Sequence, residues 1–159
     1  MLSKGTQRLA DDHVALDELL KQLHAALDHD DLDAAYAKLD LFWAKLAVHI
    51  RAEHLHLFPC VLSEEDAVIE QLGADHEFFM RQLASAIETI RTGQGLSAVK
   101  SIISDIEQRL AHHNQIEESN VYHRATTVLN PEELEELSQR ISSELHKRPS
   151  RFTAETWAL

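Results

Sequence analysis

LDLFWAKLAVHIRAE, residues 39 to 53, is the stretch that decides the fold class of this protein. Its apolar side chains recur at steps of three and four, which is the period of one face of an α-helix. The same steps continue from the apolar residues onto a histidine and then onto a glutamate. This face is made of Leu39, Phe42, Leu46, His49 and Glu53. The pattern predicts a long core helix that carries two residue types able to bind a metal ion.

Three further segments show the same period, and in each of them the apolar stripe also runs onto a histidine. These stripes are Leu9, His13, Leu16 and Leu20; Ile69, Leu72, His76 and Phe79; and Val99, Ile103, Ile106, Leu110, His113 and Glu117. The last stripe selects His113 rather than its neighbour His112 as the inward residue. We therefore expect four long helices with one core histidine each, at about residues 6–28, 31–58, 64–91 and 96–128.

Capping and breaking residues set the expected ends of these helices. Pro59 lacks a backbone donor and should end the second helix. Ser63 with Asp66 resembles a capping box at the start of the third helix, and Gly73 weakens the first turns of that helix. Asn130, followed by a proline and two acids, predicts a fifth helix that reaches about residue 147.

The whole pattern predicts an all-α protein, namely an antiparallel up-down-up-down four-helix bundle with an additional C-terminal helix. Residues 1–128 should form the bundle, residues 129–148 a helix packed on the bundle or at the interface of a homodimer, and residues 149–159 a tail. Only 4 glycines and 3 prolines in 159 residues agree with few loops and no sheet.

Composition disfavours several classes of partner. The formal net charge of −12 would repel both nucleic acid and anionic lipid. No apolar run approaches the length of a membrane span, and the polar start lacks the apolar core of a signal peptide. A single cysteine, Cys60, excludes an internal disulfide. We expect a cytoplasmic protein without nucleic-acid or membrane partners.

The glutamates on the core stripes point to a bound cation. A buried ionised carboxylate is costly unless it is paired, and no Lys or Arg occupies these stripe positions. The spacing also repeats, because 36 residues separate His13 from His49 and 37 separate His76 from His113. Two helical hairpins related by a pseudo-twofold axis could hold two adjacent metals, each on two histidines, with the glutamates able to bridge. The aligned segments are DHVALDELL (12–20) with DHEFFMRQL (75–83), and HIRAEHLHLF (49–58) with HNQIEESNVY (113–122).

The mixture of ligand types favours iron or manganese. A structural zinc site would be four-coordinate and usually richer in cysteine. The order His-x-x-x-Glu also differs from the Glu-x-x-His motif of ferritin-like bundles. Iron is therefore the expected metal, in a bundle of a different kind from ferritin.

These residues, in this order and spacing, resemble the hemerythrin-like family, also called the HHE cation-binding domain, over about residues 8–128. The resemblance implies an antiparallel four-helix bundle around a non-heme di-iron centre. It implies His13 and His49 as ligands of one iron, His76 and His113 as ligands of the other, and Glu53 and Glu117 as bridging carboxylates. This chain departs from the oxygen-carrying members at Met80, where they have a further histidine, and at Glu117, where an aspartate is often found. The missing imidazole would open a coordination position and change the potential of the iron.

The expected function is binding or sensing of O2, NO, peroxide or iron itself by two iron ions, for which manganese or zinc could substitute. The expected partner is a small diatomic ligand or peroxide. Two alternatives stay open: a di-iron enzyme that acts on peroxide or O2, and a regulatory interaction module whose bundle is ordered by metal. We favour a role without turnover and assign no catalytic residue.

Some residues near the stripes have weaker assignments. His54, His56 and His112 fall off the stripes, so solvent-facing or supporting roles are expected for them. Tyr122 aligns with Phe58 in the internal repeat, which favours core packing, although its hydroxyl could hydrogen-bond a ligand.

Overall fold

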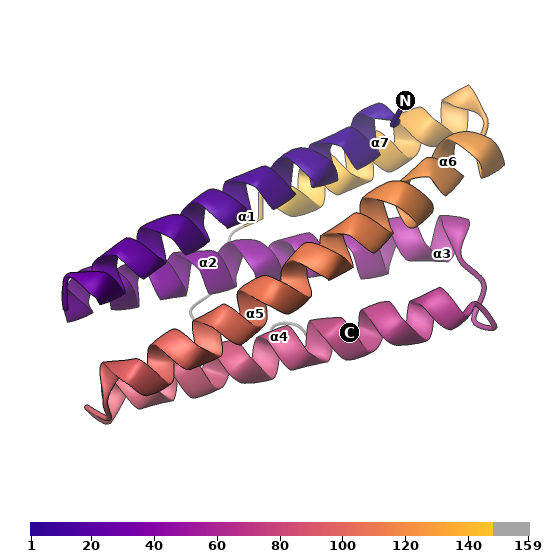
Figure 1. The fold of residues 1–159 in the computed structure, drawn as a ribbon. Coiled ribbons are helices and arrows are strands. Elements are labelled where there is room, and N and C mark those ends of the chain that lie inside the picture. The colour runs from indigo at the N-terminus through magenta and orange to yellow at the C-terminus, as the bar shows by residue number, and fades with distance from the viewer. Residues whose placement is uncertain (148–159) are drawn as a thin grey trace.

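The chain forms an all-helical bundle in a computed structural model, which describes residues 1–147 (Figure 1). The tail expected at residues 149–159 lies outside the described residues. The long helices are α1 (Lys4–Asp28), α2 (Leu32–Ala52), α4 (Ala67–Arg91) and α5 (Leu96–Ile116). The shorter elements are η1 (Glu53–Leu57), α3 (Phe58–Val61), η2 (Glu117–Val121), α6 (Tyr122–Val128) and α7 (Pro131–Leu145), where η marks a π-helical turn. No strand occurs within the described part of the chain, as expected.

Two apolar clusters fill the bundle, one toward each end. The larger cluster contains Leu16, Phe42 and Leu110, and the smaller one contains Leu9 and Val121. Each cluster draws side chains from several helices, so burial of this apolar surface holds the helices together. The histidine stripes pass from one cluster to the other, which places the predicted ligands at the boundary between them.

The prediction that Pro59 ends the second helix is wrong, because the chain stays helical through α3 to Val61. A π-helical turn, η1, comes between α2 and α3 and shifts the hydrogen-bond register. The N–H of Phe58 bonds to the carbonyl of Glu53, five residues earlier rather than four. Pro59 then falls in the first turn of α3, where its missing N–H costs no helical hydrogen bond. The fourth helix repeats this arrangement, with η2 between α5 and α6.

The start of α4 also differs from the prediction. The helix begins at Ala67 rather than at residue 64, and the capping box expected at Ser63 is absent. The Asp66 side chain makes no capping bond because its carboxylate accepts a bond from Arg124 instead. Gly73 does not interrupt α4, which is continuous to Arg91.

Helix α7 packs against α1, α2 and η1. It begins with a complete capping box between Asn130 and Glu133, and it buries Leu137 and Ile141 against the smaller cluster. α1 approaches α7 so closely at Gly5 that a Cβ there would lie 3.0 Å from the Cα of Ser138. Any side chain at this position would therefore require α1 and α7 to move apart by a few tenths of an ångström. None of the helices within residues 1–147 is long and apolar enough to cross a membrane.

Candidate metal centre

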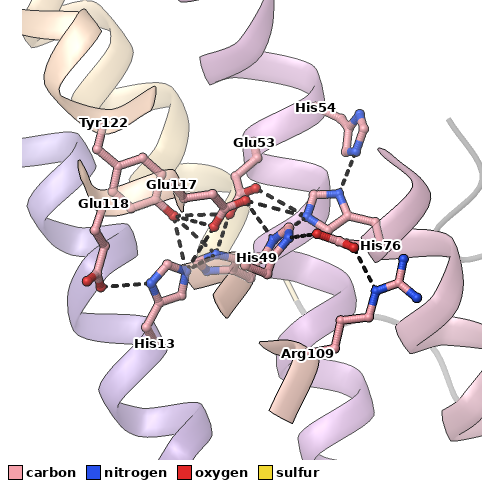
Figure 2. Close-up of polar contacts among 11 residues, drawn as sticks. His13, His49, Glu53, His54, His76, Arg109, Glu117, Glu118 and Tyr122 are labelled. Carbon is pink, nitrogen blue, oxygen red and sulfur yellow. Dashed lines mark hydrogen bonds and ion pairs between the residues drawn. The ribbon is translucent and has the colours of Figure 1, made fainter. Parts of the chain in front are cut away.

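The six predicted ligands come together in the interior of the bundle (Figure 2). Each is nearly or completely buried. They form two groups of four residues, and in each group the ligand atoms lie within 4.8 Å of one another. The groups are His13, His49, Glu53 and Glu117, and Glu53, His76, His113 and Glu117. The two glutamates belong to both groups, so the fold brings together two adjacent positions that share a pair of carboxylates.

Within each half, two imidazoles face one another. The Nε2 atoms of His13 and His49 are 3.1 Å apart, and those of His76 and His113 are also 3.1 Å apart. Glu117 spans both halves, because one oxygen lies 3.2 Å from His13 Nε2 and the other lies 2.8 Å from His113 Nε2. Glu53 does the same through its contacts with His49 and His76.

The outer nitrogen of each ligand histidine has a polar partner of its own. His13 Nδ1 lies 2.9 Å from Glu118, His49 Nδ1 lies 3.5 Å from Asp12, His76 Nδ1 lies 2.8 Å from His54, and His113 Nδ1 lies 3.0 Å from Asp75. Where the partner is a carboxylate, Nδ1 carries the proton and donates it. The Nε2 lone pair of that ring is then left facing the centre, which is the form of imidazole that binds a metal.

This donor set fits a cation. In the proton-free form that binds a metal, the facing Nε2 lone pairs and the carboxylate oxygens are all acceptors, so they repel one another unless a cation lies among them. Glu53 Oε2 and Glu117 Oε1 are buried and, apart from their ion-pair contacts with His76 and His113, have no hydrogen-bond partner of good geometry. Such orphaned atoms are rare in a folded core, and cation binding would satisfy both of them.

The pKa shifts of the shared carboxylates point the same way. Burial raises the pKa of Glu53 well above its usual value, and the charge of Glu117 adds to this rise. Burial also acts upward on Glu117, but the charge of His113 and its hydrogen bond hold the pKa of Glu117 well below its usual value. Two carboxyl groups whose pKa values are pushed apart are a pair that cannot both ionise easily without a bound cation.

The histidines of the second half are affected in opposite directions. Burial lowers the pKa of His76 to about 3, although its contact with Glu117 opposes the shift. Burial also acts downward on His113, but the charge of Glu117 and the hydrogen bond to Asp75 outweigh it and raise the pKa to about 10. Without a metal, a proton on His113 therefore supplies the positive charge beside Glu117, and a metal bound there would take its place.

Tyr122 is part of the centre. Its buried hydroxyl donates toward Glu53 Oε1 at 3.1 Å and Glu117 Oε2 at 3.2 Å, and it lies 3.2 Å from His13 Nε2. Five residues separate Glu117 from Tyr122, and in an α-helix that step would turn the side chains about 140° apart. The π turn η2 accommodates the extra residue and brings both onto one face. The core packing expected for Tyr122 is therefore correct, and its hydroxyl also bonds the ligands.

Sequence reasoning missed three residues that support the ligands. Asp12 and Asp75 each precede a ligand histidine in the chain, but each carboxylate reaches the histidine of the next helix. The repeated Asp-His pair in the two aligned segments was a signal that could have identified them. Arg109, which bonds Asp75 at 2.7 Å, has no comparable signal in the sequence.

The histidines expected to lie off the ligand face do so. His54 bonds His76, His56 bonds Glu144 of α7, and His112 is exposed. Met80, at the position of the further family histidine, is 1% exposed and packs in the larger apolar cluster.

Buried imidazoles and carboxylates converging from several helices define the protein as a cation-binding helical bundle. The family model described as Hemerythrin HHE cation binding domain matches residues 4–125, and the chain belongs to this family. The resemblance drawn from the sequence is thus confirmed. Comparisons with curated proteins and with solved structures gave no match. Helix α7 lies beyond the matched residues.

Proposed function

We propose that this protein holds two iron ions side by side and uses them to bind or sense a small ligand such as O2, NO or peroxide, or iron itself. The observation that carries the proposal is the sharing of Glu53 and Glu117 by two groups of buried ligands. A single ion would leave one pair of facing imidazoles without a cation. We also propose that α1, α2, α4 and α5 follow one another in up-down-up-down order. The short connections at residues 29–31 and 92–95 favour this order, because short loops join antiparallel neighbours.

The chain's own residues prepare the site before any ligand arrives. The Nδ1 bonds to Glu118, Asp12 and Asp75 fix the ring orientations and keep the Nε2 lone pairs inward. The apolar clusters on both sides exclude bulk water, so the carboxylates interact strongly with a bound cation. Bound iron would supply redox chemistry and open coordination positions.

Burial supports a small ligand rather than an organic substrate. No predicted ligand is more than 3% exposed, and the two apolar clusters pack directly against the centre. A diatomic molecule or peroxide is of the size that such a space can admit through side-chain motion.

An enzyme that consumes peroxide is the second candidate, and the Tyr122 hydroxyl favours it. This buried O–H lies between both glutamates and His13, where it can donate a hydrogen bond to a ligand bound beside His13. Burial and the glutamate charges raise its pKa well above the usual value, so the group keeps its proton. Met80 favours the same reading, because a thioether in the apolar core replaces a histidine of the oxygen-carrying members.

Metal analysis tests the proposal most directly. The purified chain is stripped of metal, loaded with Fe2+ without air, and measured for iron content and optical absorption before and after O2. We expect about two irons per chain and a new near-ultraviolet absorption on oxidation. A spectral change that reverses when O2 is removed would support ligand binding, whereas sustained consumption of peroxide above that of free iron would support the enzyme. One zinc per chain, or no bound metal after anaerobic loading, would overturn the di-iron proposal.

A further inference from the structure

The outer partners of the ligand histidines differ in how far their charges are compensated. The Asp75 side chain is 7% exposed and bonds Arg109. Burial acts upward on the pKa of Asp12, but the hydrogen bond and charge of His49, with smaller contributions from the nearby charges of Lys45 and Arg8, hold it below its usual value. Asp75 and Asp12, the outer partners of His113 and His49, therefore each have positively charged side chains near them.

Glu118 is arranged differently. Its side chain is 43% exposed, and the only ion pair found for it among the described residues is with His13. The Nδ1 atom of His13 contacts Glu118 and its Nε2 atom faces the centre, so this one ring lies between the protein surface and the metal centre (Figure 2). Of the four ligand histidines, His13 is thus the one whose outer partner is a solvent-exposed carboxylate without a Lys or Arg in the described contacts.

A surface hollow lies at this point, between α1 and the α5–η2 segment. Its lining includes His13, Asp17, Asn114 and Glu118 and contains no Lys or Arg. Three other hollows described on the surface are lined by at least one cationic side chain each, and none of them is lined by a predicted ligand. The hollow outside His13 therefore combines negative charge with direct contact to the centre.

Asn114 gives an independent sign that the hollow suits a cation. The residue is only 7% exposed, it lines the hollow, and its side-chain oxygen Oδ1 has no hydrogen-bond partner. A buried amide oxygen without a donor is costly. Carboxylate and amide oxygens together are ligands that a hydrated divalent cation accepts.

We propose that this hollow is the entry site for divalent iron. Fe2+ is attracted by Asp17 and Glu118, contacts Asn114, and passes inward when the His13 side chain moves aside. The inference rests on the proposed metal centre and adds a route to it. The attraction is electrostatic, so Asp17 raises the rate of loading, while the interior ligands and the hydrogen-bond partners that orient them set the final metal content.

The test measures the rate at which apo-protein takes up Fe2+ without air, by stopped-flow mixing at low and high salt. The double variant Asp17→Asn with Glu118→Gln removes both charges, and glutamine keeps an acceptor for His13. We expect uptake at low salt to slow by about tenfold or more, with a weaker dependence on salt. Asp17→Asn alone, which leaves the His13 hydrogen bond to Glu118 intact, should slow uptake in the same sense and leave the final iron content at that of the wild type.

The control is Asp105→Asn with Glu88→Gln, which makes the same charge change at exposed positions of α5 and α4. Uptake by this control should match the wild type. Equal rates in all chains, or equal slowing in both double variants, would overturn the entry site and leave the metal centre standing. A lower final iron content in the Asp17→Asn variant would also overturn it, because Asp17 would then act on retention. No metal uptake by the wild type would overturn the metal centre and the entry site together.

Discussion

The two halves of the metal centre come from the same internal repeat, yet their surroundings are not the same. In the first half, Tyr122 stacks on His13 with ring centroids 5.7 Å apart and brings a hydroxyl to the centre. In the second half, Phe58 occupies the equivalent position, stacks on His76 at 6.2 Å, and brings no polar atom. The outer partners differ too, because a carboxylate supports His13 and an imidazole supports His76.

The internal repeat thus gives both halves the same kind of inner ligands. Differences at single positions of the repeat, such as Tyr122 against Phe58, give each half its own chemical surroundings. Two bound ions would experience the same kind of inner ligands but different donors, charges and access to solvent. We therefore expect the two positions to be distinguishable by experiment, and the following substitutions test that expectation in order of decreasing effect.

The largest effects should come from the inner ligands. Glu117→Ala removes a carboxylate shared by both halves and should abolish stoichiometric binding of both metals, whereas His49→Ala should first empty the half to which it belongs. Both variants should lose the stabilisation that bound metal gives and melt at lower temperature. Metal content and thermal unfolding measure this. His112→Ala, at an exposed position, should change neither quantity, and equal metal content in all three variants would contradict the ligand assignment.

Smaller effects should follow from the carboxylates behind the histidines. Asp75→Asn and Asp12→Asn each weaken the orientation of one ring, and losses of about 10–100-fold in metal affinity are typical of such changes. We expect the larger loss for Asp75, which lies 3.0 Å from its histidine, than for Asp12 at 3.5 Å. Competition with a metal chelator gives both affinities. A larger loss of affinity in the Asp12 variant than in the Asp75 variant would contradict this expectation.

Exchange of the stacked rings should change the spectrum more than the affinity. Tyr122→Phe makes the first half resemble the second and removes one buried hydroxyl, which should alter stability by about 1 kcal/mol. Metal content should persist, while the absorption spectrum of the oxidised protein shifts. The matched variant Phe58→Tyr places a hydroxyl beside His76 instead. Unchanged spectra in both variants would mean that the rings act in packing alone.

The smallest effect should come from Arg109, whose side chain is largely outside the core. Burial raises the pKa of Asp75, but the hydrogen bonds from His113 and Arg109 outweigh it and keep the pKa low. Arg109→Gln should therefore raise the pKa of Asp75, so that protonation and metal release begin at a higher pH as the solution is acidified. Because exposed ion pairs contribute at most about 1 kcal/mol, affinity at neutral pH should fall by no more than about fivefold. Metal retention measured across an acid titration checks the shift, and an unchanged release curve would remove Arg109 from the site.

The sequence was informative wherever helical period and burial act together. The steps of three and four identified the long helices and the inward histidines, including His113 rather than His112. The approach was weaker where side chains choose between partners. Nothing local indicates that Asp66 pairs with Arg124 rather than capping α4, or that Arg109 bonds Asp75.

The α-helical period also gave wrong predictions at the π turns η1 and η2. A rule of 3.6 residues per turn places Pro59 inside a helix that it should break, and it places Tyr122 away from the face of Glu117. A π turn depends on hydrogen bonds of the folded backbone and leaves little trace in the spacing of apolar residues. The same cause thus explains the wrong end of the second helix and the incomplete assignment of Tyr122.

The turns η1 and η2 act as fixed offsets of one residue in the angular register of the two helices. Removal of one residue from η2 would restore ordinary α-helical spacing, and a step of four residues, about 40° off the same face, would leave Tyr122 beside Glu117. If instead the chain kept its length but lost the π turn, everything beyond η2 would rotate by about 100°. Glu117 would keep its place, while Tyr122 and the start of α6 would turn to a different side of the bundle. Each π turn therefore absorbs one residue of chain length, and this keeps the aromatic end of each half aligned with its glutamate.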